Sequence, residues 1–279
     1  MVRIREDGTP EGFLAAVDEY QTVRYDVSDE GVGTLTLNRP DKLNAFDETM
    51  LRELRAVIWS ANFDERVRVL VITGAGRGFC SGRDIEGLQW ENNLVSPQYR
   101  AYVRANHETF DDLEALEKPV IAMVNGICAG GVELAASCDF RIASTAAQFL
   151  LPEANLGVIP ASGACSRLIQ MIGMGRVKEM VMTAQPVSAE EAYRIGLANR
   201  VAAPERLLDE TLAFARVLLA RPPLAIGMAK HIINTCQNVD VETGRILERL
   251  GQSVLVRTAD GQEGVAAFRE KRRPQFRGR

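Results

Sequence analysis

The sequence has few of the residues that build metal centres or disulfide frameworks. Its 279 residues include only two histidines, His107 and His231, which are far apart and lack metal-ligand spacing. Five cysteines, at positions 80, 128, 138, 165 and 236, contain no C-x-x-C pair. An odd set of this kind is typical of free thiols in a reducing compartment. We therefore expect a cytoplasmic protein that holds no metal ion.

Long apolar runs and an excess of positive charge are also missing. The longest apolar stretch, residues 119–137, is interrupted by Asn125, Glu133 and several glycines, so it is a poor membrane span. The first residues contain no apolar signal core, and we expect no secretion. The net charge of −4 favours neither nucleic acid nor an anionic membrane as a partner.

Two phosphate-binding loops are excluded by spacing. Gly74, Gly76 and Gly78 begin like a dinucleotide loop, but the G-x-G-x-x-G pattern fails at Phe79, and no G-K-[ST] follows. What remains is an ordinary globular composition, with 46% hydrophobic and 25% charged residues. The length allows one sizeable core with a small helical appendage.

The first part of the chain alternates strand-like and helix-like patterns. Runs at 22–28 and 33–38 are separated by Asp29-Glu30-Gly31, which is typical of a hairpin turn. Asp47 can cap a helix whose apolar residues share one face. Further strands are expected at 67–73, 119–124, 140–144 and near Phe149, with helices at 11–20, 97–116 and from Gly131.

After Pro160 the pattern becomes almost entirely helical. Ser188 and Glu191 form a capping-box pair, and the last helices are expected at 241–256 and 260–271. The alternation in the first part predicts parallel strands joined by crossover helices, and so an α/β fold. We divide the chain into an N-terminal extension (1–20), an α/β core (21–200) and a C-terminal helical region (201–279).

Two glycine-rich turns each follow a strand-like run. The first spans residues 74–85 and contains Gly82-Arg83-Asp84-Ile85; the second spans 125–134 and contains Gly130-Gly131. Glycine permits the backbone angles and the close ligand approach that bare backbone donors need. Two strand ends of this kind can aim two amide N–H groups at one oxygen, which is the arrangement of an oxyanion hole.

Two glutamates follow the turns, in mostly apolar surroundings. Glu133 and Glu153 lie twenty positions apart. Paired carboxyl groups near an oxyanion hole favour acid–base chemistry on a carbonyl compound. A plainer reading makes Glu133 a helix-terminus charge and Glu153, after Pro152, a surface turn residue. The residues alone do not assign the acid and the base.

Four segments in order resemble the crotonase superfamily, the enoyl-CoA hydratase/isomerase group, over about residues 20–276. They are Asn38-Arg39-Pro40-Asp41-Lys42-Leu43-Asn44-Ala45, residues 78–85, residues 125–139, and the C-terminal pair of Glu263-Gly264 with residues 267–272. The resemblance implies a spiral of ββα units with a C-terminal helical region. It also implies acyl-CoA thioester substrates, with coenzyme A as part of the substrate and no separate cofactor.

The resemblance also implies roles for particular residues. The backbone N–H groups of Arg83 and Gly130 would form the oxyanion hole, and Glu133 and Glu153 would be the two hydratase carboxyls. Glu153 would donate a proton to the α-carbon while Glu133 holds the water. Lys42 and Leu43 would contact the adenine end of coenzyme A, Asp84 and Ile85 would line the substrate site, and Lys271 would reach the phosphates, from a neighbouring subunit in an oligomer.

By this resemblance, the presence of both carboxyls favours hydration of an enoyl-CoA, because many family members with other activities lack one of them. The alternatives are another reaction of the superfamily, double-bond isomerisation or ring hydrolysis, or a non-catalytic protein that binds acyl-CoA or RNA through its basic tail. Ala161 stands where many members have glycine, and its methyl group is expected to reshape the acyl pocket.

The helices after Pro160 also lead to an expectation about assembly. Leu212, Ala215, Leu218 and Leu219 form an apolar face that we expect a lone α/β spiral to leave uncovered. Such faces usually mark protein interfaces. The resemblance implies homotrimers, often paired into hexamers.

Overall fold

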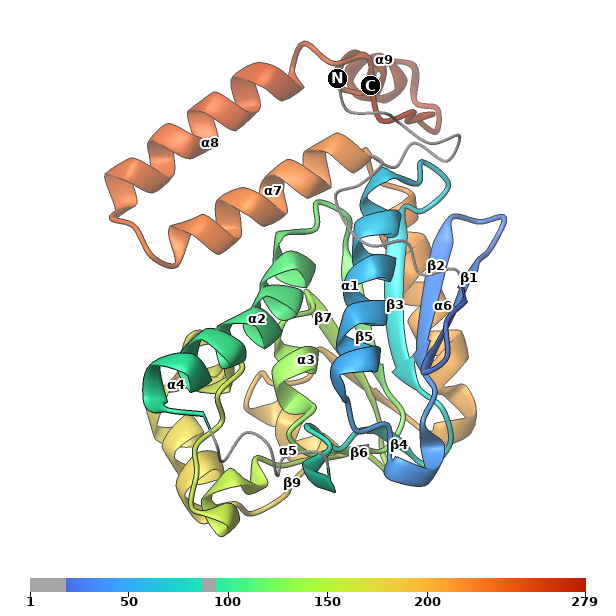
Figure 1. The fold of residues 1–279 in the computed structure, drawn as a ribbon. Helices are drawn as coiled ribbons and strands as arrows, with labels where there is room; N and C mark the ends of the chain where they lie inside the picture. The colour runs from blue at the N-terminus through green and yellow to red at the C-terminus, as the bar shows by residue number, and fades with distance from the viewer. Residues whose placement is uncertain (1–18, 87–93) are drawn as a thin grey trace.

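The computed structural model describes residues 19–86 and 94–279 (Figure 1). The expected helix at 11–20 lies almost wholly outside the described residues. The described strands are β1 Val23–Val27, β2 Val32–Leu37, β3 Val69–Gly74, β4 Gly78–Cys80, β5 Val120–Val124, β6 Ile127–Cys128, β7 Phe140–Ser144, β8 Gln148–Phe149, β9 Val187–Ser188 and β10 Arg200–Ala202. The described α-helices are α1 Glu48–Phe63, α2 Ser96–Ala115, α3 Val132–Ala136, α4 Ala164–Thr183, α5 Ala189–Arg194, α6 Leu207–Leu219, α7 Pro223–Cys236, α8 Val241–Leu255 and α9 Ala259–Glu270.

The strands form two sheets within the described part of the chain. The larger has the order β1-β2-β3-β5-β7-β10, and the smaller has the order β4-β6-β8-β9. β1 and β2 pair antiparallel as the predicted hairpin, whereas β2, β3, β5, β7 and β10 pair in parallel. The expected α/β class with mainly parallel strands is confirmed.

A three-part unit repeats along the chain. β3 and β4 are followed by α2, β5 and β6 by α3, and β7 and β8 by the 3₁₀ segment Pro152–Leu156 and α4. In each unit the first strand joins the larger sheet and the second joins the smaller sheet. This is the predicted spiral of ββα units. In each repeat, the segment that follows the short strand of the smaller sheet therefore begins at the edge of that sheet.

Local signals account for several helix starts. The Asp47 side chain accepts a hydrogen bond from the Met50 N–H at 2.9 Å, so Asp47 is the N-cap of α1 as predicted. Ser188 likewise caps α5 by accepting the Glu191 N–H at 3.2 Å. The apolar face of α1, including Leu54 and Val57, is fully buried against the core.

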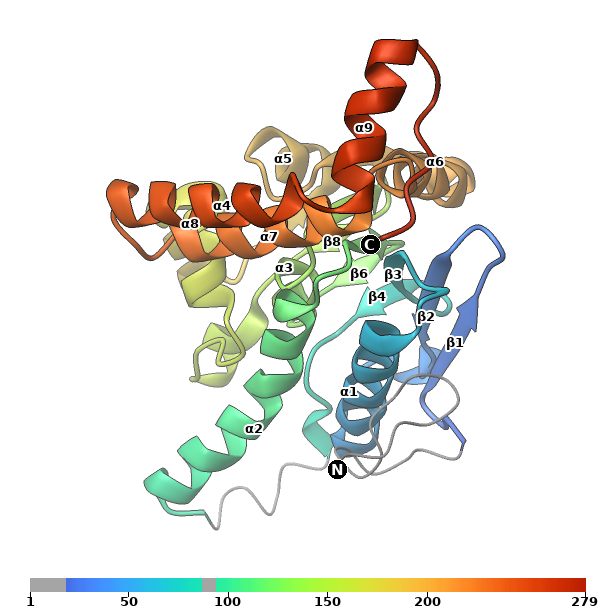
Figure 2. The same cartoon turned by 90° about the horizontal axis from the view of Figure 1, so that it is seen from above.

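The larger sheet lies between helices. Figure 2 shows α6 on one side of it and α1 and α2 on the other. Every residue of β3 and β5 is buried, as expected for central strands covered on both faces. Burial on both faces explains why these runs are almost continuously apolar.

The structure covers the apolar face of α6 in part. Ala215 is fully buried in a cluster with Val71 and Ile121 of the sheet, whereas Leu212, Leu218 and Leu219 pack against the same cluster but are only partly buried. The sequence shows that this face is apolar, but it does not show that the second face of the larger sheet packs against it. α6 therefore completes the core.

The exposed apolar residues lie further along the chain. α7 and α8 run side by side above the sheet, with α9 at their end (Figure 1). Ile246, Leu250 and Val254 are spaced four residues apart on α8 and are all exposed; we call them the α8 stripe. The role of residues 201–279 in assembly, and the division of the chain at residues 20 and 200, remain predictions.

No single described helix is long and apolar enough to cross a membrane. One pair, Pro204–Leu219 with Pro223–Cys236, reaches that length and composition only across a bend of 102°.

Candidate active site

The two glycine-rich turns lie side by side because β4 and β6 are paired in parallel. Ala129 N–H donates to the Cys80 carbonyl at 3.0 Å, which continues the pairing past the strands. Gly82 has φ +93°, and a Cβ atom there would lie 2.8 Å from the Gly130 Cα atom. Glycine is therefore required where the backbones touch. The structure brings together the two segments expected to supply the oxyanion donors.

Glu133 lies in the first turn of α3 and is only 5% exposed. Its Oε1 atom accepts N–H bonds from Ser162 at 2.6 Å and from Ala164 at 3.2 Å. Burial raises the pKa of Glu133 to about 7, although the two backbone bonds oppose the rise; the nearby charge of Glu153 adds to it. The carboxyl can therefore exchange a proton near neutral pH.

Glu153 lies in the 3₁₀ segment that follows β8, next to the second turn. Its Oε1 atom is 3.2 Å from the position that a Cβ atom on Gly130 would occupy. Its Oε2 atom is buried without a hydrogen-bond partner among the described residues. Burial raises the pKa of this carboxyl as well. An acidic group in this state is suited to hold and deliver a proton.

One cavity of about 450 Å³ brings most of the predicted site residues together. These are Lys42, Arg83, Asp84, Ile85, Gly130, Glu133, Glu153 and Ala161. The other lining residues include apolar and aromatic ones, which are Phe46, Tyr99, Tyr102 and Val103 of α2, Leu156, Val158 and Ile159. The cavity thus combines a polar centre with an apolar enclosure, as small-molecule sites generally do.

Two predicted binding residues do not line this cavity in the described chain. The Leu43 carbonyl accepts the Ser81 N–H at 2.9 Å, so Leu43 supports the first turn through its backbone. Lys271 ends α9, which lies at the top of Figure 1, whereas β4 and β6 lie at the bottom. A contact of Lys271 with substrate from a neighbouring subunit remains a prediction.

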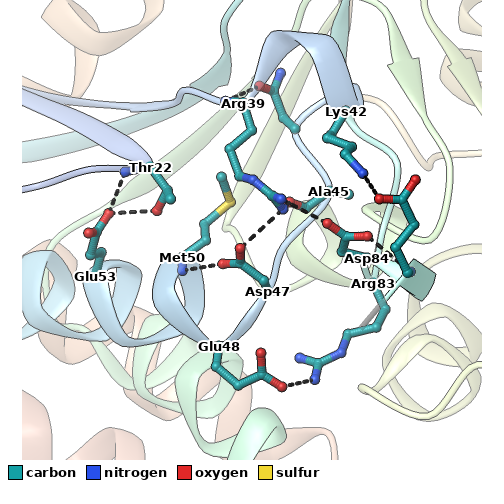
Figure 3. A network of polar contacts seen from close by, with 12 residues as sticks. Thr22, Arg39, Lys42, Ala45, Asp47, Glu48, Met50, Glu53, Arg83 and Asp84 are labelled. Carbon is teal, nitrogen blue, oxygen red and sulfur yellow. Dashed lines mark hydrogen bonds and ion pairs between the residues drawn. The ribbon is translucent and has the colours of Figure 1, made fainter. Parts of the chain in front are cut away.

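Arg39, which the sequence places only within a motif, joins two segments that line the cavity (Figure 3 shows its contacts). Arg39 donates to the Ala45 carbonyl at 2.6 Å and to Asp84 at 2.8 Å, and it lies 3.4 Å from Asp47. It therefore ties the segment after β2 to the segment that carries Arg83. The ion pair of Lys42 with Glu86 joins the same two segments.

The side chain of Arg83 also has defined partners. Its Nη2 atom donates to Glu48 at 2.6 Å, and it contacts the Tyr102 hydroxyl (Figure 3 shows the Glu48 contact). The guanidinium lies 5.4 Å from the centre of the Tyr102 ring. These contacts fix the side chain against α1 and α2, so the Arg83 backbone is held at the cavity wall.

Comparison with known proteins agrees with this arrangement. A family model described as enoyl-CoA hydratase/isomerase matches residues 28–279. The chain belongs to this family. Its larger sheet, smaller sheet and helical end region are the crotonase fold.

Similar bacterial proteins are named for more than one activity. The chain is 38% identical over 250 residues to a crotonyl-CoA hydratase of Syntrophomonas wolfei, covering 89% of this chain and 95% of that protein. It is 37% identical over 253 residues to a 1,2-epoxyphenylacetyl-CoA isomerase of Escherichia coli, covering 90% and 97%. The crystal structure of an enoyl-CoA hydratase from Bacillus anthracis superposes with a TM-score of 0.87 at 34% identity, covering 93% and 100%.

The groups that hold Glu133 could not be recognised in the sequence. The Ser162 and Ala164 amides come from a loop about thirty positions away, and Arg167 on α4 supports that loop. Backbone donors leave no residue-type signal. The glycine at position 163 was the one visible sign of an unusual turn.

Proposed function

We propose that the protein is an enoyl-CoA hydratase that adds water across the 2,3 double bond of an acyl-CoA thioester. The observation that carries this proposal is the pairing of a buried carboxyl, Glu133, with a partly buried one, Glu153, in one cavity beside Gly130. The pKa values of both carboxyls are raised by burial. Such a pair can hold one proton and one negative charge near neutral pH.

In the proposed reaction the N–H groups of Arg83 and Gly130 bind the thioester oxygen. The oxygen gains negative charge when the β-carbon is attacked, and losing one such donor typically costs about 10²–10³ in rate. Ionised Glu133 accepts a proton from water while the water oxygen bonds to the β-carbon. Protonated Glu153 then gives its proton to the α-carbon, which completes the addition. The addition leaves Glu133 protonated and Glu153 ionised. Glu133 then loses a proton to solvent and Glu153 takes one from solvent, which restores the starting state.

The geometry at Glu133 supports its role in holding water. Both described hydrogen bonds fall on Oε1, so Oε2 is left to accept from a water in the cavity. The Glu153 Oε2 atom, buried without a described partner, is suited to face the α-carbon. Each acid or base role is worth about 10²–10⁴ in rate.

A second reaction of the family is favoured by one observation. The similarity to the 1,2-epoxyphenylacetyl-CoA isomerase equals the similarity to the hydratase within a percentage point. The same oxyanion donors would stabilise the enolate of an isomerisation.

One assay separates the two reactions. Purified protein is given short, long, branched and aromatic 2-enoyl-CoA thioesters and the corresponding 3-enoyl-CoA thioesters, and products are separated by mass. The proposal expects 3-hydroxyacyl-CoA from at least one 2-enoyl substrate, at a higher kcat/KM than any double-bond shift. Conversion of 3-enoyl substrates alone would favour the isomerase.

We also propose a cytoplasmic homotrimer or hexamer that needs no separate cofactor and takes no nucleic acid or membrane partner. The support for assembly is the exposed α8 stripe, since exposed apolar patches commonly mark interfaces. Closed symmetry is what homo-oligomers generally adopt. In such an assembly Lys271 would reach the coenzyme A phosphates of a neighbouring subunit.

A further inference from the structure

An arginine outside the two turns contacts both the Glu133 loop and the substrate-side helix. Arg167, in the first turn of α4, has a side chain only 12% exposed. Its Nε atom donates to Glu114 at 2.8 Å and its Nη2 atom to Asp111 at 2.5 Å, both on α2. Its Nη1 atom donates to the Ser162 carbonyl at 3.2 Å. One guanidinium thus joins α2 to the loop of residues 162–164.

The loop is shaped around this side chain. Gly163 has φ +108°, and a Cβ atom there would lie 1.8 Å from Arg167 Nη1. Any other residue would have to displace the guanidinium as well as adopt a strained backbone. The loop conformation and the position of Arg167 therefore depend on each other.

The same loop supplies both amides that hold Glu133. The Ser162 N–H donates to Glu133 while the Ser162 carbonyl accepts from Arg167. The Ala164 N–H also donates to Glu133, and the Gly163 carbonyl of the same peptide unit accepts the backbone N–H of Arg167 at 2.8 Å. The guanidinium of Arg167 therefore holds the Ser162 carbonyl, and the backbone N–H of Arg167 holds the Gly163 carbonyl. Both bonds fix the loop that carries the two amides.

We infer that Arg167 is a positioning residue for Glu133: it clamps the 162–164 loop to α2, so that the loop amides hold the carboxyl at a fixed place in the cavity. This inference rests on the proposed function for its kinetic consequence. α2 also lines the cavity through Tyr99, Tyr102 and Val103. The clamp therefore fixes Glu133 relative to the wall that would face the acyl group.

Several titratable side chains lie around Glu133 and Arg167. Glu133 is faced by Glu153 and by the thiols of Cys80 and Cys165, and Arg167 is the cation whose charge lowers its pKa. Arg167 is faced by Asp111 and Glu114, and His107 lines the neighbouring cavity. Loss of the Arg167 charge should leave Glu133 harder to ionise.

Another arginine has similar chemistry without the loop contact. Arg55 of α1 donates to Asp112 at 2.8 Å and to Glu108 at 3.3 Å, so it also bridges two α2 carboxyls. Its side chain is 34% exposed. Arg55→Gln and Arg55→Lys are therefore matched controls for the loss of a helix-to-helix ion pair alone.

The test compares Arg167→Gln and Arg167→Lys with these controls. For each folded variant, kcat and KM are measured across pH on the best enoyl-CoA substrate. The Glu133 ionisation is followed separately by infrared difference spectroscopy against the same variant with Glu133→Gln. We expect Arg167→Gln to lower kcat at least about tenfold with KM changed less than about threefold, and to raise the Glu133 midpoint. Arg167→Lys, which keeps the charge but cannot span three acceptors, should leave the midpoint near wild type and lower kcat at least about threefold.

Two results would overturn the inference. One is a folded Arg167→Gln protein whose kcat and Glu133 midpoint match those of Arg55→Gln. If Arg167→Gln does not fold, the other is an Arg167→Lys protein whose kcat matches that of Arg55→Lys. If wild-type protein turns over no enoyl-CoA, the proposed function fails, but the infrared midpoint still decides whether Arg167 controls Glu133.

Discussion

The carboxyl of Glu133 accepts the backbone N–H of Ser162 at 2.6 Å, across 29 positions of sequence. A buried acid is thereby held by a loop amide and not by a cation. A neutral donor fixes the position of a carboxyl while leaving its pKa high enough to titrate near pH 7. This relationship links the stability of the protein to its proposed chemistry.

The first prediction concerns stability. The fold raises the pKa of Glu133 from its usual value of 4.5 to about 7, so the folded protein favours the neutral carboxyl. The free energy of unfolding therefore falls as the pH rises from about 4.5 to about 7. Glu133→Gln removes this loss and keeps an oxygen for the loop amides. We expect the variant to gain stability over wild type at pH 8, on the order of 3 kcal/mol, and little at pH 4.

Urea unfolding at the two pH values measures the difference. Glu179→Gln, at an exposed carboxyl that pairs with Arg176, is the control and should show no comparable gain at pH 8. An equal effect of pH on wild type and Glu133→Gln would show that Glu133 ionises freely in the fold.

The second prediction concerns the proton donor. Glu153→Gln should lower kcat for hydration by at least about 10²-fold, because the amide cannot protonate the α-carbon. Coenzyme A affinity, measured by calorimetry, should change little. If the two carboxyls act as one unit, the Glu133→Gln/Glu153→Gln double variant should be barely slower than either single variant. Near-wild-type turnover by Glu153→Gln would remove this residue from the mechanism.

The third prediction tests the oxyanion hole. Gly130→Pro deletes the N–H of residue 130 and should abolish turnover. Gly130→Ala keeps the N–H, but its methyl group would lie 3.1 Å from Gly82 and 3.2 Å from Glu153 Oε1. It should therefore lower kcat less than the proline does. Gly175→Ala is the control, since no atom lies within 4 Å of its added Cβ.

Circular dichroism melting accompanies these assays, because a misfolded site would also be inactive. A Gly130→Pro protein that folds and turns over substrate at the wild-type rate would rule out the oxyanion role of this amide.

Some of the fold could be predicted because its signals are local. The hairpin at Asp29-Glu30-Gly31 and the Asp47 cap depend on residues within a few positions of each other. The glycine-rich turns and the two glutamates were also found, since each follows a recognisable strand pattern. The sequence does not show which amide meets which carboxyl. The contacts from Ser162 to Glu133 and from Arg167 to α2 depend on how the ββα units stack.

The partial covering of the α6 face has a similar cause. The apolar residues Leu212 and Leu218 were recognised on α6, but periodicity says only that a face is buried, not by what. The sheet covers them in part. The apolar residues of α8 cannot be recognised as exposed from the sequence, because exposure depends on which elements pack against the helix.

The fourth prediction therefore concerns assembly through the α8 stripe. Light scattering should give a mass near a multiple of three chains. Leu250 is 59% exposed on α8, and Leu250→Glu should lower that mass by placing a charge in an apolar interface. Val217→Glu, at an exposed position on α6, is the control. A fully active wild-type monomer would refute the assembly and the shared role of Lys271.

The central claim is that water is added to the substrate at this site, and isotopes test it most directly. Wild-type protein is incubated with its best 2-enoyl-CoA in water labelled with ¹⁸O and deuterium, and the product is analysed by mass spectrometry and NMR. The account predicts one labelled oxygen on carbon 3 and one deuterium on carbon 2, with both incorporated at least about 10²-fold more slowly by Glu153→Gln. A product with a shifted double bond and no labelled oxygen would contradict it.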